Sequence, residues 1–345
     1  MKKGLLILLC LPMIGFGQVW NFEYLSNGYD FNRIYFYNSS IGFAVGDNGA
    51  MVKTTDGGDI WNSVNTGITK DITDIKFANA DTGYICTEGF FSGNIIQGEL
   101  LQTIDGGNTW NTIFVGAGNN TIYNFNKIHK ITNSDIQILG GYYYDPNNVG
   151  SAIILSFDLF TSNITTSQVV SNSSSMGFDS YSYSSNSYTI VKGFSLTGSM
   201  GSGSYNNIET NISGVNITSN YPGGFNAQFY SIDMLDSNPI NGIAVGKSGK
   251  IYNLYNMPSL TNAIVENTSF TNTTVDLWSV DMMDDKGWIV GDVGTILFTV
   301  DSGQTWSQYN NPILFEDIHS VTFSDKCNGW LAGQNGLIGR YSYEE

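Results

Sequence analysis

The sequence predicts an all-β protein, a seven-bladed β-propeller of four-stranded antiparallel blades whose ring is closed by the N-terminal strand of the mature chain. Three observations support this prediction. A unit of short strands and tight turns recurs along the chain. The composition, with 40 Gly, 20 Tyr, 20 Phe and 13% charged residues, is typical of a turn-rich β protein. Finally, the two chain ends supply complementary parts of one sheet.

The clearest unit runs from Gly42 to Trp61. Phe43–Val45 and Ala50–Thr54 are short β-favouring runs, whereas Gly46–Gly49 and Asp56–Asp59 are turns rich in residues that tolerate positive φ. One unit cannot bury both of its faces, so neighbouring copies are expected to stack. Full or partial copies occur at Gly83–Trp110, Gly242–Ile251, Gly287–Trp306 and Gly329–Ile338.

Each copy has an equivalent residue at the end of its second strand, and counting these residues gives seven units. Successive positions are 41 to 53 residues apart, the spacing of four-stranded propeller blades rather than of helical repeats. These positions are Gly46, Thr87, Gly140, Gly193, Gly246, Gly291 and Gly333.

The pattern of the first 17 residues indicates a secretory signal peptide. Lys2 and Lys3 precede an apolar run from Leu5 to Ile14, and small residues stand at the −3 and −1 positions of a cleavage site before Gln18. The run is too short to be a membrane anchor, and no later stretch is apolar enough to cross a bilayer. We therefore expect a propeller over residues 18–345, secreted or held in the periplasm or cell envelope.

The chain ends predict how the ring closes. The seventh unit stops at Tyr341 after three strands. Val19–Phe22 opens with Trp-Asn, as do the fourth strands expected after Trp61 and Trp110. The N-terminal strand should thus complete the last blade and remove an exposed sheet edge.

Charge and cysteine content limit the partners. The net charge is −16, and −18 once Lys2 and Lys3 leave with the signal peptide, which disfavours nucleic acid and anionic lipid. Cys86 and Cys327 lie in separate repeats, so we expect no disulfide between them. We expect a monomer without a cofactor.

Several of these motifs resemble those of a known family. The turn Thr103–Trp110, Thr-Ile-Asp-Gly-Gly-Asn-Thr-Trp, is similar to the Asp-box of sialidases and sortilin-type propellers, and Thr54–Trp61 and Thr299–Trp306 are variants of it. Together with Asp71–Phe77 and the Val-Gly-x-x-Gly pattern, it resembles the photosystem II stability and assembly factor family of seven-bladed propellers. The resemblance covers nearly all of residues 19–341. It implies the fold, whereas a photosystem role would require a photosynthetic host.

The Asp-box aspartates are interpreted as structural. Asp56, Asp105 and Asp301 occupy equivalent turns in different blades, where a carboxylate can accept backbone N–H bonds. The tryptophans that end these turns are expected to pack between blades.

Enzyme classes are mostly excluded by composition. A sialidase of this fold would need a cluster of three arginines, and the chain has only Arg33 and Arg340. Its two histidines, His129 and His319, cannot form a three-histidine metal site. We therefore predict no catalytic and no metal site.

A carbohydrate-active propeller remains the alternative, as a glycan-binding module or a glycoside hydrolase. A hydrolase would need two channel carboxylates about 5–10 Å apart, beside a tryptophan platform. Candidates in or beside first strands are Asp74, Asp233, Asp281 and Asp317.

The preferred reading is a non-catalytic scaffold that binds a protein partner, or a glycan, through enlarged turns. The turns between second and third strands are minimal in most units but long in units two to four, at Glu88–Asn94, Gly141–Asn148 and Phe194–Gly201. Aromatic-tipped loops on a rigid scaffold suit recognition. The predicted ligand-binding residues are Phe90, Phe91, Tyr142, Tyr143, Tyr144, Asp145, Phe194 and Met200.

Overall fold

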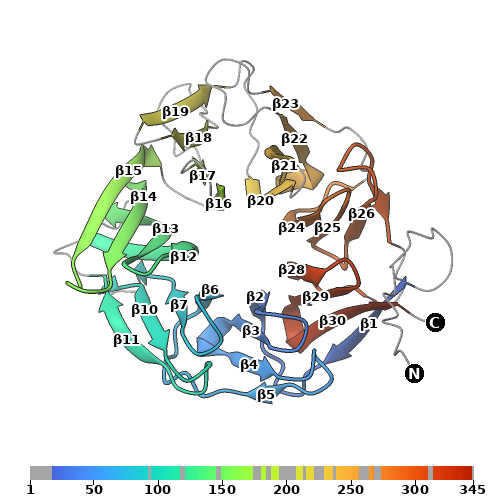
Figure 1. Cartoon of the computed structure of the whole chain (residues 1–345), viewed down its shortest axis with the longest axis horizontal. Coiled ribbons are helices and arrows are strands. Elements are labelled where there is room, and N and C mark those ends of the chain that lie inside the picture. Colours follow the sequence, from blue (N-terminus) through green and yellow to red (C-terminus); the bar gives the residue numbers. More distant parts are fainter. Residues whose placement is uncertain are drawn as a thin grey trace, which may run out of the picture.

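The computed structural model confirms the propeller. It describes residues 18–91, 95–116, 121–144, 149–173, 180–183, 188–193, 207–212, 215–220, 229–235, 238–255, 264–267, 273–309 and 314–343. The predicted signal peptide, residues 1–17, lies outside these ranges. The described strands form seven four-stranded antiparallel sheets arranged in a ring (Figure 1).

The first three blades follow the chain from the inner strand outward. Blade 1 has β2 (Phe31–Phe36), β3 (Gly42–Gly46), β4 (Met51–Thr54) and β5 (Asn62–Ser63). Blade 2 has β6 (Ile72–Phe77), β7 (Gly83–Thr87), β10 (Glu99–Thr103) and β11 (Asn111–Val115), with a small hairpin of β8 (Phe90–Phe91) and β9 (Ile95–Ile96). Blade 3 has β12 (Thr121–Ile131), β13 (Asp135–Tyr144), β14 (Val149–Asp158) and β15 (Ile164–Ser173).

The remaining blades repeat this order. Blade 4 has β16 (Ser180–Tyr183), β17 (Tyr188–Gly193), β18 (Asn207–Ile212) and β19 (Val215–Asn220). Blade 5 has β20 (Phe229–Leu235), β21 (Asn238–Gly246), β22 (Ile251–Tyr255) and β23 (Ile264–Asn267). Blade 6 has β24 (Leu277–Met283), β25 (Lys286–Gly291), β26 (Ile296–Thr299) and β27 (Ser307–Gln308). Blade 7 has β28 (Ile318–Asp325), β29 (Asn328–Gly333), β30 (Leu337–Tyr343) and β1 (Gln18–Tyr24).

Closure occurs as predicted, because β1 pairs antiparallel with β30 from Gln18 opposite Tyr343 to Tyr24 opposite Leu337. Trp20 is 3% exposed, and its ring lies 5.4 Å from that of Tyr341 and 5.6 Å from that of Trp288. The strand β1 is thus an integral part of the last blade.

Close backbone approach explains the repeated glycine. A Cβ at Gly46 would lie 1.9 Å from the carbonyl oxygen of Asp30, and one at Gly333 would lie 2.1 Å from that of Asp317. At these glycines the end of the second strand therefore passes too near the start of the first strand for a side chain. Thr87 pairs with Ile72 as Gly46 pairs with Phe31, so it occupies the same place in blade 2.

Aspartates just before the first strands tie neighbouring blades together. Each carboxylate accepts the N–H of a positive-φ residue in the turn between second and third strands of the preceding blade. Three of these turns are the 3-10 segments η1 (Asp47–Gly49), η2 (Lys247–Gly249) and η3 (Gln334–Gly336). The bonds run from Asn335 to Asp30 (2.8 Å), Asn48 to Asp71 (2.7 Å), Ser248 to Asp276 (2.9 Å) and Val293 to Asp317 (2.9 Å). The side of the ring with these turns and the blade connections is called here the connection face.

The Asp-Gly-Gly turns lie on the opposite face. The hydrogen bonds within them match the interpretation that their aspartates are structural. The Asp105 carboxylate accepts N–H bonds from Asn108 (3.0 Å) and Thr109 (2.9 Å). Asp56 and Asp301 accept the equivalent N–H bonds from Ile60 and Thr305. Of the tryptophans that end these turns, Trp110 and Trp306 are buried and Trp61 is half-buried.

The core lies between adjacent sheets rather than in one centre. Between blades 1 and 2 it includes Phe43, Ile72 and Ile85, and between blades 7 and 1 it includes Phe31 and Trp330. Cys86 is a buried free thiol, so the prediction of no disulfide to Cys327 is confirmed. Within the described part of the chain, no helix has the length and apolar character to cross a membrane.

Candidate functional site

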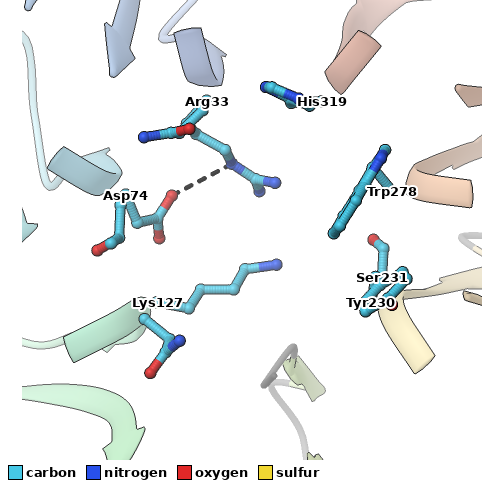
Figure 2. A pocket seen from close by; sticks show the side chains of 10 residues that line it. Arg33, Asp74, Lys127, Tyr230, Ser231, Trp278 and His319 are labelled. Atoms are coloured by element: carbon cyan, nitrogen blue, oxygen red, sulfur yellow. Dashed lines mark ion pairs between the residues drawn. The ribbon is translucent and has the colours of Figure 1, made fainter. Parts of the chain in front are cut away.

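A cavity of about 380 Å³ is lined by residues of the inner strands, which start on the connection face, and we call it the channel mouth. It is built from residues of the inner strands of six blades, which the ring brings together although they are scattered along the chain. Its lining residues are Asn32, Arg33, Thr73, Asp74, Asn126, Lys127, Tyr230, Ser231, Trp278 and His319 (Figure 2).

One side of the cavity is cationic. Arg33 Nε lies 3.2 Å from Asp74 Oδ1, and the terminal nitrogens of Arg33 point into the cavity (Figure 2). The side chain of Lys127 extends across the cavity toward the opposite wall. Asp74 is buried and also accepts the N–H of Ile128 at 2.8 Å, so it holds Arg33 from a fixed position. Lys76 lies on the same strand as Asp74, where burial lowers its pKa.

The opposite side is aromatic. The rings of Tyr230 and Trp278 stack with centroids 4.3 Å apart, and His319 meets Trp278 edge-on at 6.0 Å. Trp278 Nε1 donates to Asp292 Oδ1 at 2.5 Å, and the Tyr230 hydroxyl donates to Asp276 at 3.1 Å. Burial, together with the charge of Asp276, raises the pKa of Tyr230. These hydrogen bonds fix both rings in place.

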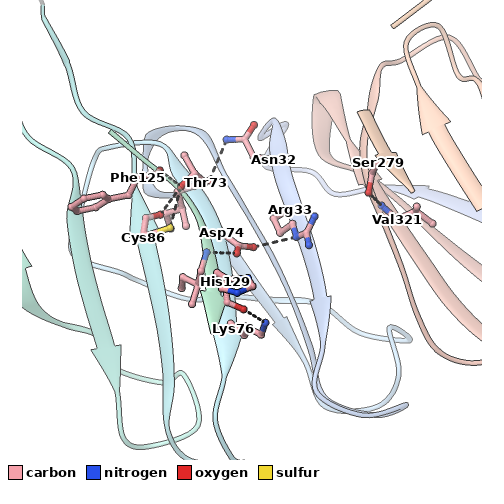
Figure 3. Close-up of polar contacts among 12 residues, drawn as sticks. Asn32, Arg33, Thr73, Asp74, Lys76, Cys86, Phe125, His129, Ser279 and Val321 are labelled. Carbon is pink, nitrogen blue, oxygen red and sulfur yellow. Dashed lines mark hydrogen bonds and ion pairs between the residues drawn. The ribbon is translucent and has the colours of Figure 1, made fainter. Parts of the chain in front are cut away.

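Polar side chains of the inner strands accept hydrogen bonds from backbone N–H groups of the next blade (Figure 3). Three of the four candidate catalytic carboxylates are used in this way. The bonds are Ile128 N to Asp74 (2.8 Å), Met282 N to Asp233 (2.7 Å), Phe323 N to Asp281 (3.0 Å), Val280 N to Ser231 (3.3 Å) and Val321 N to Ser279 (3.3 Å). The fourth candidate, Asp317, ties blade 7 to blade 6.

The lining does not support the two-carboxylate hydrolase. Trp278 supplies an aromatic platform, but Asp74 is the one carboxylate among the described residues that line the cavity. It is already paired with Arg33. The same described part of the chain holds no group of three or more His, Cys, Asp and Glu residues placed to bind a metal ion.

Two groups of carboxylates lie behind the lining residues, one at blades 1 and 2 and one at blade 6. We call Asp47, Asp71, Glu88, Asp276 and Asp292 the acidic collar, and the Arg33 and Lys127 side of the cavity the cationic floor. Asp47 accepts a hydrogen bond from the lining residue Asn32 at 2.9 Å, as Asp292 and Asp276 do from Trp278 and Tyr230. Burial, a hydrogen bond to Asp71 and the charges of Asp71 and Asp47 raise the pKa of Glu88 to about 7. Burial likewise raises the pKa of Asp47.

The predicted loop residues are placed only in part. Phe90 and Phe91 form β8, and their side chains lie outside the described residues, as do Asp145, Phe194 and Met200 entirely. Tyr142, Tyr143 and Tyr144 were expected in a loop, but they continue β13 and pair with both β12 and β14. The reason is that blade 3 has strands of 10 or 11 residues, so its hairpin reaches farther than in the other blades.

Of the residues that line the cavity, sequence reasoning proposed Asp74 as a channel-facing side chain and missed the others as a group. Most of them share a signal, because they occupy the second or third position of an inner strand, as in Asn32-Arg33, Thr73-Asp74 and Tyr230-Ser231. An alignment of the repeats would have shown those residues at equivalent positions. Asn126 and Lys127 differ, because β12 begins five residues before Asn126.

Comparisons with known proteins agree with this architecture. Residues 17–113 match the family described as photosynthesis system II assembly factor YCF48, which confirms the predicted resemblance over that segment. Among characterised proteins, none matches the chain significantly in sequence.

Solved structures share the fold across nearly the whole chain. A structure described as YCF48 bound to D1 peptide has 17% identity and a TM-score of 0.68, covering 94% of each chain. YCF48 from Cyanidioschyzon merolae has 14% identity and a TM-score of 0.67, covering 94% of this chain and 98% of that one. A streptogramin B lyase has 11% identity and a TM-score of 0.64, covering 95% and 98%. At these identities the likeness concerns the fold.

Proposed function

We propose that this protein is a secreted or envelope-held, non-catalytic propeller that captures a protein partner on its connection face, with a segment of the partner entering the channel mouth. The main observation in support is the cavity between the Arg33 and Lys127 side and the stacked rings of Tyr230 and Trp278. Its walls are fixed by ion pairing and hydrogen bonding, as a preorganised recognition site requires.

Two further observations support the proposal. The similar structure described as YCF48 bound to D1 peptide holds a peptide ligand on the same fold. In addition, the printed pairing of β1 with β30 involves residues from Gln18 onward, so cleavage at the predicted site would keep that pairing.

The aromatic residues of the enlarged turns remain part of the proposed surface. The β8–β9 hairpin and the end of β13 belong to turns between second and third strands, which lie on the connection face. We propose that Phe90, Phe91, Tyr142, Tyr143, Tyr144, Asp145, Phe194 and Met200 contact the partner around the channel mouth.

Affinity capture from the envelope fraction of the native host tests this function. The wild-type protein should retain a defined partner, and both Lys127→Glu and the triple Tyr142→Ser, Tyr143→Ser, Tyr144→Ser variant should lose it. Lys326→Glu is the matched control, because Lys326 is exposed in the turn between β28 and β29, on the opposite face. Equal capture by all variants that retain the wild-type melting curve would refute the proposal.

A glycan ligand is the second candidate, favoured by Trp278 in the cavity wall, since sugars pack on exposed aromatic faces. Binding of the protein to a glycan array, lost on Trp278→Ala, would support it. Retention of protein capture by that variant would separate the two functions.

A further inference from the structure

The charged side chains at the channel mouth form two zones. The inner zone is the cationic floor, where Arg33 and Lys127 point into the cavity. The outer zone is the acidic collar, whose members bond directly to lining residues or to one another. Asp47, Asp276 and Asp292 therefore lie within hydrogen-bond distance of residues that line the cavity.

This arrangement disfavours simple ligands of one sign. A free anion could pair with the floor, but it would approach through the collar of a protein whose net charge is −16. A purely basic segment would pair with the collar and leave Arg33 and Lys127 facing more positive charge. Only a ligand with a negative tip and positive flanks matches both zones.

The floor is shaped for a carboxylate in particular. Asp74 engages Arg33 through Nε, which leaves the terminal nitrogens directed into the cavity. A planar guanidinium presents such nitrogens as a fork that fits a carboxylate by two parallel hydrogen bonds. Trp278, fixed by its bond to Asp292, offers an apolar face to the hydrocarbon part of the entering segment.

We propose that the channel mouth binds an extended peptide segment whose carboxylate pairs with Arg33 and Lys127 and whose neighbouring Lys or Arg residues pair with the acidic collar. The carboxylate belongs either to a chain terminus or to an Asp or Glu side chain. This inference rests on the proposed capture of a protein partner and specifies the chemistry of the captured segment.

A soluble library of random octapeptides with free C-termini, selected on the purified secreted protein, tests this chemistry. Enriched sequences should combine a carboxylate with Lys or Arg within a few residues. Amide capping and Asp/Glu to Asn/Gln replacement then identify which carboxylate binds. The responsible change should weaken binding about tenfold or more, because a charge-assisted hydrogen bond is lost.

Variants of the protein complete the test. Lys127→Gln should weaken binding of the enriched peptides about tenfold or more, whereas Lys326→Gln should change it by less than about twofold. Arg33→Lys keeps the pairing with buried Asp74 but loses the fork, so it should also weaken binding without unfolding the ring. Replacing the peptide's basic residues by Glu should abolish binding, and Glu88→Gln should partly relieve that loss.

Two results would overturn the inference. One is that no octapeptide is enriched although envelope capture succeeds, in which case the proposed function stands and its peptide chemistry is wrong. The other is that enriched peptides bind equally well without their carboxylate or to Lys127→Gln. Failure of envelope capture together with specific peptide binding would instead count against the proposed protein partner.

Discussion

Aspartate side chains organise the backbone of this propeller at three recurrent positions. They close the Asp-Gly-Gly turns, they tie the start of a first strand to the preceding blade, and they bond the inner strand of the next blade. In each position a carboxylate accepts N–H groups that would otherwise lack partners. Repetition of one residue type at equivalent places therefore reflects a shared structural role rather than catalysis.

The turn aspartates should make the fold sensitive to acid. Hydrogen bonds from the side chain and N–H of Thr109 hold the pKa of Asp105 below its ordinary value. Because the folded pKa is lower than the unfolded one, the stabilisation is present at neutral pH and is lost as pH falls below about 4. We expect Asp105→Asn to lower Tm at pH 7, with the difference from wild type shrinking toward pH 2.

Thermal unfolding followed by circular dichroism across this pH range checks the expectation. Asp81→Asn is a suitable control, because Asp81 is exposed in the neighbouring turn on the same face. A constant gap between Asp105→Asn and wild type down to pH 2 would contradict the hydrogen-bond explanation.

Among the elements, the closing strand and the repeated glycines could be predicted because local chemistry dictates them. Gly46 has backbone within 1.9 Å of where its Cβ would be, so the requirement repeats wherever the geometry repeats. The β13 hairpin could not be predicted in this way. Strand length in blade 3 depends on pairing across β12, β13 and β14, and the run Tyr142–Tyr144 is compatible with both loop and strand.

The closing strand should contribute strongly to stability through Trp20. Its side chain is 3% exposed and packs among Trp288, Phe323 and Tyr341. We expect Trp20→Ala to reduce the free energy of unfolding by about 3–5 kcal/mol, as for other large buried aromatics. Tyr24→Ala lies on the same strand but is 48% exposed, so it should cost less than about 1 kcal/mol.

Denaturant unfolding of the two variants measures this difference. Equal and small losses would mean that β1 is not an energetic part of blade 7, despite its pairing with β30.

For the whole molecule, the ring converts scattered sequence positions into one site. The cavity residues run from Asn32 to His319, and no local motif joins them. Sequence reasoning could therefore predict the channel and its face, but it could not predict which side chains point inward together. The outcome is a cationic floor inside a strongly acidic protein, an arrangement that the net charge of −16 conceals.

The acidic collar should also set how stability varies with pH. Burial and the adjoining Asp71 and Asp47 raise the pKa of Glu88 to about 7, well above its value in the unfolded chain. The folded state therefore holds an extra proton between about pH 4.5 and 7, and its stability falls as pH rises through that interval. Above pH 7 the ionised Glu88 carboxylate repels its neighbours across the junction of blades 1 and 2, where Asn48 bonds Asp71.

Glu88→Gln should remove the loss of folding stability that ionisation of Glu88 causes. Relative to wild type we expect the variant to be more stable at pH 8 than at pH 5 by roughly 1 kcal/mol, a value reduced from the full pKa shift because the side chain is half-buried. Asp81→Asn makes the same change in net charge at an exposed site, so it separates the local repulsion from the general self-repulsion of an acidic protein. If both variants gain equally at pH 8, the pH dependence belongs to the overall charge and the Glu88–Asp71 contact has no special part in it.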